Sequence, residues 1–182
     1  MGNTLQNSPR MTAEEYYKAE SGLNQPTELI GGEIFALASP GLQHQCISGR
    51  LFAGIDGFIH ANHGNCAVYQ AIDVQLSEED VVVPDVAVIC EQSKLNEQHC
   101  IGAPDWVIEI TSTNRSNDFD RKLYLYRMYG VREYWIVDTM THKVWVYCFE
   151  KHPNVVGFYD WADRIPVGIY GGKLEIRIAD LL

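Results

Sequence analysis

The run Ala103-Pro-Asp-Trp-Val-Ile-Glu-Ile-Thr111, followed later by Glu133-Tyr-Trp-Ile-Val-Asp138, decides the fold of this 182-residue chain. Both runs are short, apolar and rich in β-branched and aromatic residues, which is typical of buried strands. The segment between them, from about Asn117 to Tyr129, has helical spacing and is followed by Gly130, a residue that commonly ends helices. Strand, helix and strand in this order predict a right-handed crossover between two parallel strands.

Upstream of this unit, the sequence predicts a short helix, a hairpin and a longer helix. Thr12 and Glu15 have the spacing of a capping box, so a short helix is expected to start there. Gly31-Gly32 joins two short strands in a tight hairpin and places Glu33 at the start of the second strand. Apolar residues recur at helical spacing over residues 43 to 62, which predicts the longest helix of the chain.

The remaining apolar segments predict further strands around the crossover unit. Residues 66 to 76 and 81 to 90 are each expected to form one strand, and the two are expected to pair antiparallel. Shorter strands are expected near 143–149, 155–160 and 173–178. The predicted fold class is therefore α/β (α+β), a mixed β-sheet flanked by helices with extra C-terminal antiparallel strands. We expect residues 1–182 to form a single domain in which residues 1–10 are flexible.

Composition points to an ordinary cytoplasmic protein. Hydrophobic residues make up 46% of the chain, and they include neither an apolar stretch long enough to span a membrane nor an N-terminal secretory signal. The five cysteines are odd in number and never form a C-x-x-C pair. We therefore expect reduced thiols in place of a disulfide framework or a zinc ribbon.

The net charge limits which nucleic-acid functions are plausible. The chain carries 24 acidic and 14 basic residues, for a formal net charge of −10. Phosphate binding depends on Lys and Arg, so the charge argues against a role in coating nucleic acid tightly and without sequence preference. An enzyme that acts on DNA remains compatible with this charge if metal ions and a local basic rim supply the positive charge.

Two carboxylates interrupt neighbouring apolar strands. Glu109 lies in the middle of its strand, where a buried charge requires an ion pair, a raised pKa or a bound cation. Asp85 follows Pro84 between two apolar runs, a position that is also typical of a simple turn. Two carboxylates from adjacent strands suit Mg²⁺, which prefers oxygen ligands.

Lys122 belongs to the predicted crossover helix and borders its apolar stripe. From there its ammonium group could reach Glu109 and stabilise negative charge on a phosphate. The alternative is a surface ion pair with Asp118, four residues earlier, and spacing alone favours that pair.

The chain resembles the PD-(D/E)XK nuclease superfamily, and more closely its Uma branch of restriction-endonuclease-like proteins. The resemblance covers roughly residues 11 to 140. The stretches that carry it are Glu28-Leu-Ile-Gly-Gly-Glu33, His44, Pro84-Asp85-Val-Ala-Val, Ala103-Pro104-Asp105-Trp-Val-Ile-Glu109-Ile, Lys122 with Tyr126, and Gly130-Val-Arg-Glu-Tyr-Trp-Ile-Val-Asp138.

The resemblance implies a restriction-endonuclease-like core and a metal-dependent endonuclease that hydrolyses DNA phosphodiester bonds with Mg²⁺ or Mn²⁺. It implies that Asp85, Glu109 and the carbonyl of Ile110 are metal ligands, that Lys122 is catalytic and that Glu33 is an additional acid. It also implies a homodimer, as is common among nucleases that cut duplex DNA. In the superfamily the lysine follows the acid by two residues, a position that Thr111 occupies here.

Other interpretations remain open. His44 matches the Uma pattern, although a histidine near a helix start more commonly caps or packs than acts as a base. The net charge and Thr111 also suit an inactive nuclease fold that serves as a binding or assembly module. A metal-dependent hydrolase of a small phosphorylated substrate would suit the acidic surface as well.

Overall fold

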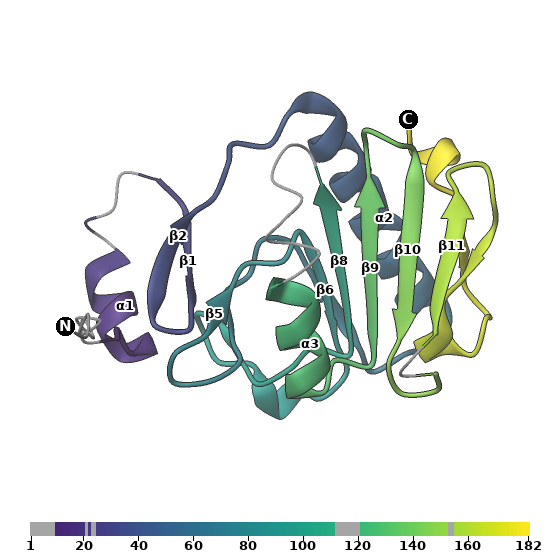
Figure 1. The fold of residues 1–182 in the computed structure, drawn as a ribbon. Coiled ribbons are helices and arrows are strands. Elements are labelled where there is room, and N and C mark those ends of the chain that lie inside the picture. The colour runs from purple at the N-terminus through teal and green to yellow at the C-terminus, as the bar shows by residue number, and fades with distance from the viewer. Residues whose placement is uncertain (1–9, 21, 23–24, 112–120, 153–154) are drawn as a thin grey trace.

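The computed structural model describes residues 10–20, 22, 25–111, 121–152 and 155–182 (Figure 1). The flexible stretch expected at residues 1–10 lies outside the described residues except for Arg10. Residues 117–120 of the predicted crossover helix also lie outside them.

A six-stranded mixed sheet forms the centre of the fold (Figure 1). Its strand order is β11-β10-β9-β8-β6-β3. β8 and β9 are parallel, as the crossover predicts, and all the other neighbouring pairs are antiparallel. The strands are β3 (Ala67–Tyr69), β6 (Val86–Ile89), β8 (Trp106–Thr111), β9 (Glu133–Asp138), β10 (Lys143–Cys148) and β11 (Val156–Asp160).

Two helices, α2 (Leu42–Ala61) and α3 (Leu123–Tyr129), cover opposite faces of this sheet. Successive strand residues point to opposite faces, so Trp106 and Ile108 pack with the apolar stripe of α2. Val107 packs instead in the core that contains α3, which lies in front of the sheet in Figure 1. The prediction of α2 is confirmed to within one residue at each end.

The N-terminal elements form a second, smaller sheet beside the first. The capping box before α1 (Ala13–Glu20) is confirmed, since the Thr12 N–H donates to Glu15 Oε2 at 2.8 Å. The hairpin of β1 (Thr27–Ile30) and β2 (Glu33–Ala36) is also confirmed, and Gly31 and Gly32 adopt φ values of 59° and 75°. This five-stranded sheet has the order β2-β1-β5-β4-β7 and adds β4 (Val74–Gln75), β5 (Val81–Val82) and β7 (Cys100–Ile101).

The prediction of two continuous strands at 66–76 and 81–90 was wrong. Each segment is broken in two, so that β3 and β6 belong to the large sheet while β4 and β5 belong to the small one. The antiparallel pairing itself is confirmed for both halves. Pro84 lacks a backbone N–H, and Ala71 adopts a φ of 48°, so neither segment continues as one strand.

The chain ends with short elements that pack on the same face of the large sheet as α2. β12 (Ile165–Pro166) pairs antiparallel with β13 (Glu175–Ile176), so the predicted strand at 173–178 is shorter than expected. The 3₁₀ helices are η1 (Gln92–Lys94), η3 (Gly168–Tyr170) and η4 (Ile178–Leu181).

The expectation of reduced thiols throughout was also wrong, because Cys66 and Cys90 form a disulfide. β3 and β6 pair antiparallel, with Ala67 opposite Ile89. Cys66, just before Ala67, therefore lies opposite Cys90, just after Ile89. Cys46, Cys100 and Cys148 are free, and burial raises the pKa of the Cys100 thiol to about 11. Within the described part of the chain, no helix is both long and apolar enough to cross a membrane.

Candidate active site

A buried lysine joins two buried carboxylates from different sheets. Lys122 Nζ lies 2.8 Å from Glu28 Oε1 on β1 and 2.9 Å from Glu109 Oε1 on β8. The exposed fractions of Glu28, Lys122 and Glu109 are 2%, 3% and 4%. Lys122 is therefore an interior residue rather than a member of a surface pair, and its predicted approach to Glu109 is confirmed. Asp118 lies outside the described residues.

Tyr126 provides a second donor to the same carboxylate. Its hydroxyl donates to Glu109 Oε1 at 2.7 Å, and its side chain is fully buried one helical turn after Lys122. Burial and the nearby charge of Glu109 hold the pKa of Tyr126 well above its usual value. The phenol consequently stays neutral and keeps its proton for Glu109. Thus an ion pair and a hydrogen bond account for a carboxylate in the middle of an apolar strand.

Asp85 is anchored to the strand that carries Glu109. Its Oδ2 accepts the N–H of Ile110 at 2.7 Å, and its Oδ1 lies 3.0 Å from His44 Nε2, in the first turns of α2. The Asp85 side chain is 24% exposed, which makes it far more open to solvent than Glu109. Asp85 and Glu109 are therefore brought to the same end of β8, with Asp85 on the open side.

The structure does not bring Glu33 to this cluster. Glu33 is exposed at the start of β2, whereas Glu28 on β1 faces inward. Glu28 Oε1 also accepts the N–H of Val83 at 2.7 Å, two residues before Asp85. Sequence reasoning missed Glu28, although its position within the short apolar run Thr27–Ile30 resembles that of Glu109 in β8.

Asp73 adds to the acidic character of this region. Burial raises the pKa of the Asp73 carboxyl, the charge of Glu28 raises it further and His99 opposes both effects. Asp73 is half-buried, which agrees with this raised pKa.

Thr111 occupies the position where the superfamily pattern has its lysine. The Thr111 side chain is buried, and its hydroxyl has no hydrogen-bond partner among the described residues. The ammonium group beside Glu109 comes instead from Lys122, at the start of the following helix. This geometry agrees with a lysine displaced from the strand to the helix.

The donor chemistry of the cluster fits a hard divalent cation. Mg²⁺ takes oxygen ligands and is commonly held by one or two carboxylates together with water and substrate phosphate. Asp85 and Glu109 provide two carboxylates around Ile110, although the described residues contain no preformed group of three or more acidic, His or Cys ligands. Water and substrate oxygens would have to complete the coordination.

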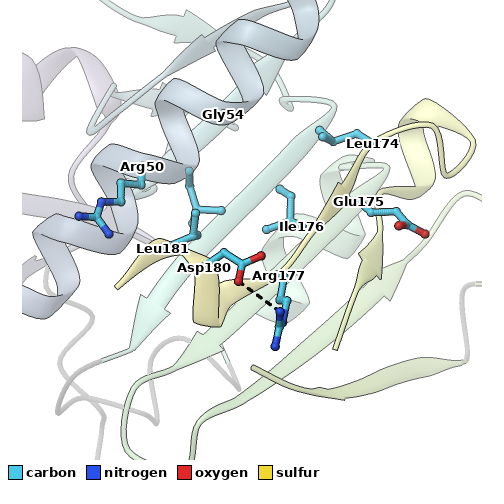
Figure 2. Close-up of a pocket in the computed structure, with 9 residues that line it drawn as sticks. Arg50, Gly54, Leu174, Glu175, Ile176, Arg177, Asp180 and Leu181 are labelled. Carbon is cyan, nitrogen blue, oxygen red and sulfur yellow. Dashed lines mark ion pairs between the residues drawn. The ribbon is translucent and has the colours of Figure 1, made fainter. Parts of the chain in front are cut away.

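A separate pocket lies away from these residues. This cavity of about 210 Å³ is lined by residues of α2 and of the C-terminal segment, which Figure 2 draws as sticks. Among them Arg177 and Asp180 form an ion pair at 3.4 Å. Its lining includes Arg50, Gly54, Ile176 and Leu181 and contains none of the predicted site residues. The candidate active site is thus the polar cluster around Glu109 and not this mainly apolar hollow.

Comparisons with known proteins bear on the family and the fold of the chain. The family model Uma2, described as "Putative restriction endonuclease", matches residues 13–161. An "Uncharacterized protein sll1609" of Synechocystis is 28% identical over 160 residues, which span 83% of this chain and 84% of the relative. A crystal structure of "a putative nuclease belonging to DUF820" from Anabaena variabilis superposes with a TM-score of 0.75 at 22% identity. That match covers 94% of this chain and 97% of the other and shows a shared fold.

Proposed function

Since the chain belongs to the Uma2 family, described as "Putative restriction endonuclease", we propose that it is a metal-dependent endonuclease that hydrolyses DNA phosphodiester bonds. The observation that carries the proposal is the convergence of Asp85, Glu109 and Lys122 around the end of β8. The mixed sheet flanked by helices also supports the proposal, because the resemblance to the nuclease superfamily implies a core of this kind. We further propose that residues 1–182 form one domain.

Each residue of the cluster has a role in this proposal. Asp85, Glu109 and the carbonyl of Ile110 hold Mg²⁺ or Mn²⁺, and when bound the cation supplies Lewis-acid activation of water and phosphate. Lys122 offsets negative charge that builds on the phosphate oxygens during attack. Glu28 takes the place that we expected for Glu33, since its carboxylate positions the Lys122 ammonium.

Two further residues keep the carboxylates in position. Tyr126 donates to Glu109 Oε1, which limits rotation of that side chain. His44 contacts Asp85 Oδ1, while the N–H of Ile110 holds Asp85 Oδ2. His44 therefore acts in this proposal through Asp85 and not as a base. Such rigid support matters because catalytic groups must be held close to their productive geometry.

The test is cleavage of supercoiled and single-stranded DNA with Mg²⁺ or Mn²⁺, compared between the native chain, Asp85→Asn and Glu109→Gln. Both substitutions preserve side-chain volume but remove the charge that holds a cation. We expect each to lower the cleavage rate by at least about 10²-fold, the scale of losing one strong electrostatic group. Asp180→Asn is the matched control, because it makes the same carboxylate-to-amide change in a side chain that is 63% exposed and pairs with Arg177.

The outcomes also separate the rival functions. If the native chain cuts none of these DNAs and calorimetry detects no binding of Mg²⁺ or Mn²⁺, the inactive binding module becomes the better account. Metal-dependent hydrolysis of a small phosphate ester without DNA cleavage would favour the small-substrate hydrolase. Unchanged cleavage by both variants would place the chemistry elsewhere in the molecule.

We also propose a homodimer, because cutting both strands of a duplex is readily achieved by paired subunits. β11 forms an edge of the large sheet in Figure 1, and Val156 and Phe158 on it are 45% and 59% exposed. Exposed apolar edge strands are suited to pairing with another chain. Sedimentation equilibrium at micromolar concentration is expected to give twice the chain mass, and a monomer under those conditions would contradict the proposal.

A further inference from the structure

Consecutive residues at the start of the crossover helix contact the same cross-strand pair of the hairpin. Lys122 Nζ lies 2.8 Å from Glu28 Oε1, and the guanidinium carbon of Arg121 lies 4.4 Å from the ring centroid of Phe35. Glu28 and Phe35 are direct partners in the β1–β2 register, so their side chains are neighbours on one face. Arg121 and Lys122 therefore contact neighbouring side chains of the hairpin.

Arg121 differs from most of the other described arginines in its partner. Arg10, Arg132, Arg164 and Arg177 each pair with a carboxylate side chain. Arg121 is exposed and contacts an aromatic ring, with no carboxylate partner within the described ranges. A guanidinium stacked on a ring keeps its N–H donors directed outward in its own plane, where a phosphate can accept them in pairs.

The charge balance makes such a residue important. At a net charge of −10, the surface as a whole repels a polyanion, so favourable contacts must come from a few positive groups next to the site. Arg121 is adjacent in sequence to Lys122, the ammonium group of the cluster. The Phe35 ring limits where the guanidinium can lie, which lowers the entropy lost when it binds.

We propose that Arg121, oriented by Phe35, binds a phosphate of the nucleic-acid backbone next to the one that is cleaved. This inference rests on the proposed function, in that it places DNA at the cluster around Glu109. In this proposal Arg121, at the rim of that site, contacts the charged phosphate backbone and does not recognise a particular base.

The experiment is fluorescence anisotropy of labelled duplex and single-stranded oligonucleotides in Ca²⁺, which replaces Mg²⁺ so that binding can be followed without cutting. The native chain is compared with Arg121→Ala, Arg121→Lys and Phe35→Leu over a range of salt concentrations. Arg164→Ala is the control because it removes the same charge from an exposed residue whose partner is Glu175.

For duplex DNA, we expect Arg121→Ala to weaken binding about tenfold and to reduce the slope of log Kd against log salt by about 0.9, the value for one phosphate contact. Arg121→Lys should keep the slope while losing part of the affinity, because its charge remains but its planar donors do not. Phe35→Leu should likewise keep the salt slope and lose part of the affinity, because it retains the Arg121 guanidinium but removes the aromatic ring that orients it.

A purely structural role for Arg121 would lower the melting temperature and leave the salt slope unchanged, and that result would overturn the assignment. Binding by Arg121→Ala that matches Arg164→Ala in both affinity and slope would overturn it as well. Neither result touches the proposed function, which the cleavage assay decides separately. Absence of binding by the native chain to every oligonucleotide would overturn both this assignment and a DNA substrate.

Discussion

Lys122→Met is expected to lower the free energy of unfolding by about 3–5 kcal/mol, the range measured when one partner of a buried ion pair is removed. Lys122 is 3% exposed and contacts the carboxylates of Glu28 and Glu109, which are buried to the same degree. Methionine fills most of the space but leaves two buried negative charges without their cation. Urea denaturation followed by circular dichroism measures the change, and DNA cleavage by the same variant is expected to be lost.

The combined variant Lys122→Met, Glu28→Gln, Glu109→Gln provides the decisive comparison. It removes the charges together, and a neutral group of similar volume is often as stable as a buried ionic one, so much of the lost stability should return. Lys18→Met is the control for an exposed pair, because Lys18 and Glu14 are 71% and 79% exposed. It should leave the free energy of unfolding almost unchanged, because exposed ion pairs contribute little. A similarly small change for Lys122→Met would contradict the buried arrangement described above.

Glu133→Ala is expected to lower the free energy of unfolding by about 2–4 kcal/mol, because buried donors lose their acceptor. Glu133 Oε1 accepts N–H groups from Trp135 Nε1 and the backbone of Gly168, and Oε2 accepts the N–H of Ile169. The side chain is fully buried and joins β9 to η3. The measurement is again urea denaturation, with Glu150→Ala as the control because Glu150 is 47% exposed and pairs with Arg132.

The contribution of Glu133 to the free energy of unfolding depends on pH, because folding changes the pKa of this side chain. Burial raises that pKa above its usual 4.5, against the opposing hydrogen bonds, so the folded chain binds the proton more tightly than the unfolded chain. Protonation of Glu133 therefore stabilises the folded chain most at a pH below the pKa that Glu133 has in the unfolded chain. This stabilisation is lost as the pH rises through the pKa of Glu133 in the folded chain. Glu133→Gln should abolish this pH-dependent part. Equal stability losses for Glu133→Gln at all pH values would contradict the raised pKa.

Local patterns in the sequence determined the framework of the molecule. The alternation of β8, the helical spacing of α2 and Gly130 at the end of α3 each reflect a period or a backbone preference that a single segment contains. The parallel pairing of β8 and β9 followed from the handedness of a crossover. The proximity of Asp85 and Glu109 was predicted separately, from their places in neighbouring apolar strands, and β6 does pair with β8.

Tertiary structure alone decided which acid completes the cluster and how the strands divide between sheets. Glu28 and Glu33 belong to the same hairpin, but the choice between them depends on which hairpin face meets Lys122. Pro84 and Ala71 interrupt the two long apolar segments, and pairing with distant strands then decides which sheet each half joins. The Cys66–Cys90 disulfide likewise requires the register of β3 against β6, since cysteines separated by 24 residues meet only when those strands pair. The sequence by itself thus determined the elements and the chemistry that they offer, because those depend on local periodicity and residue type. The partners of each charge came from the tertiary structure, because contacts between distant segments are set by the packing of the whole chain.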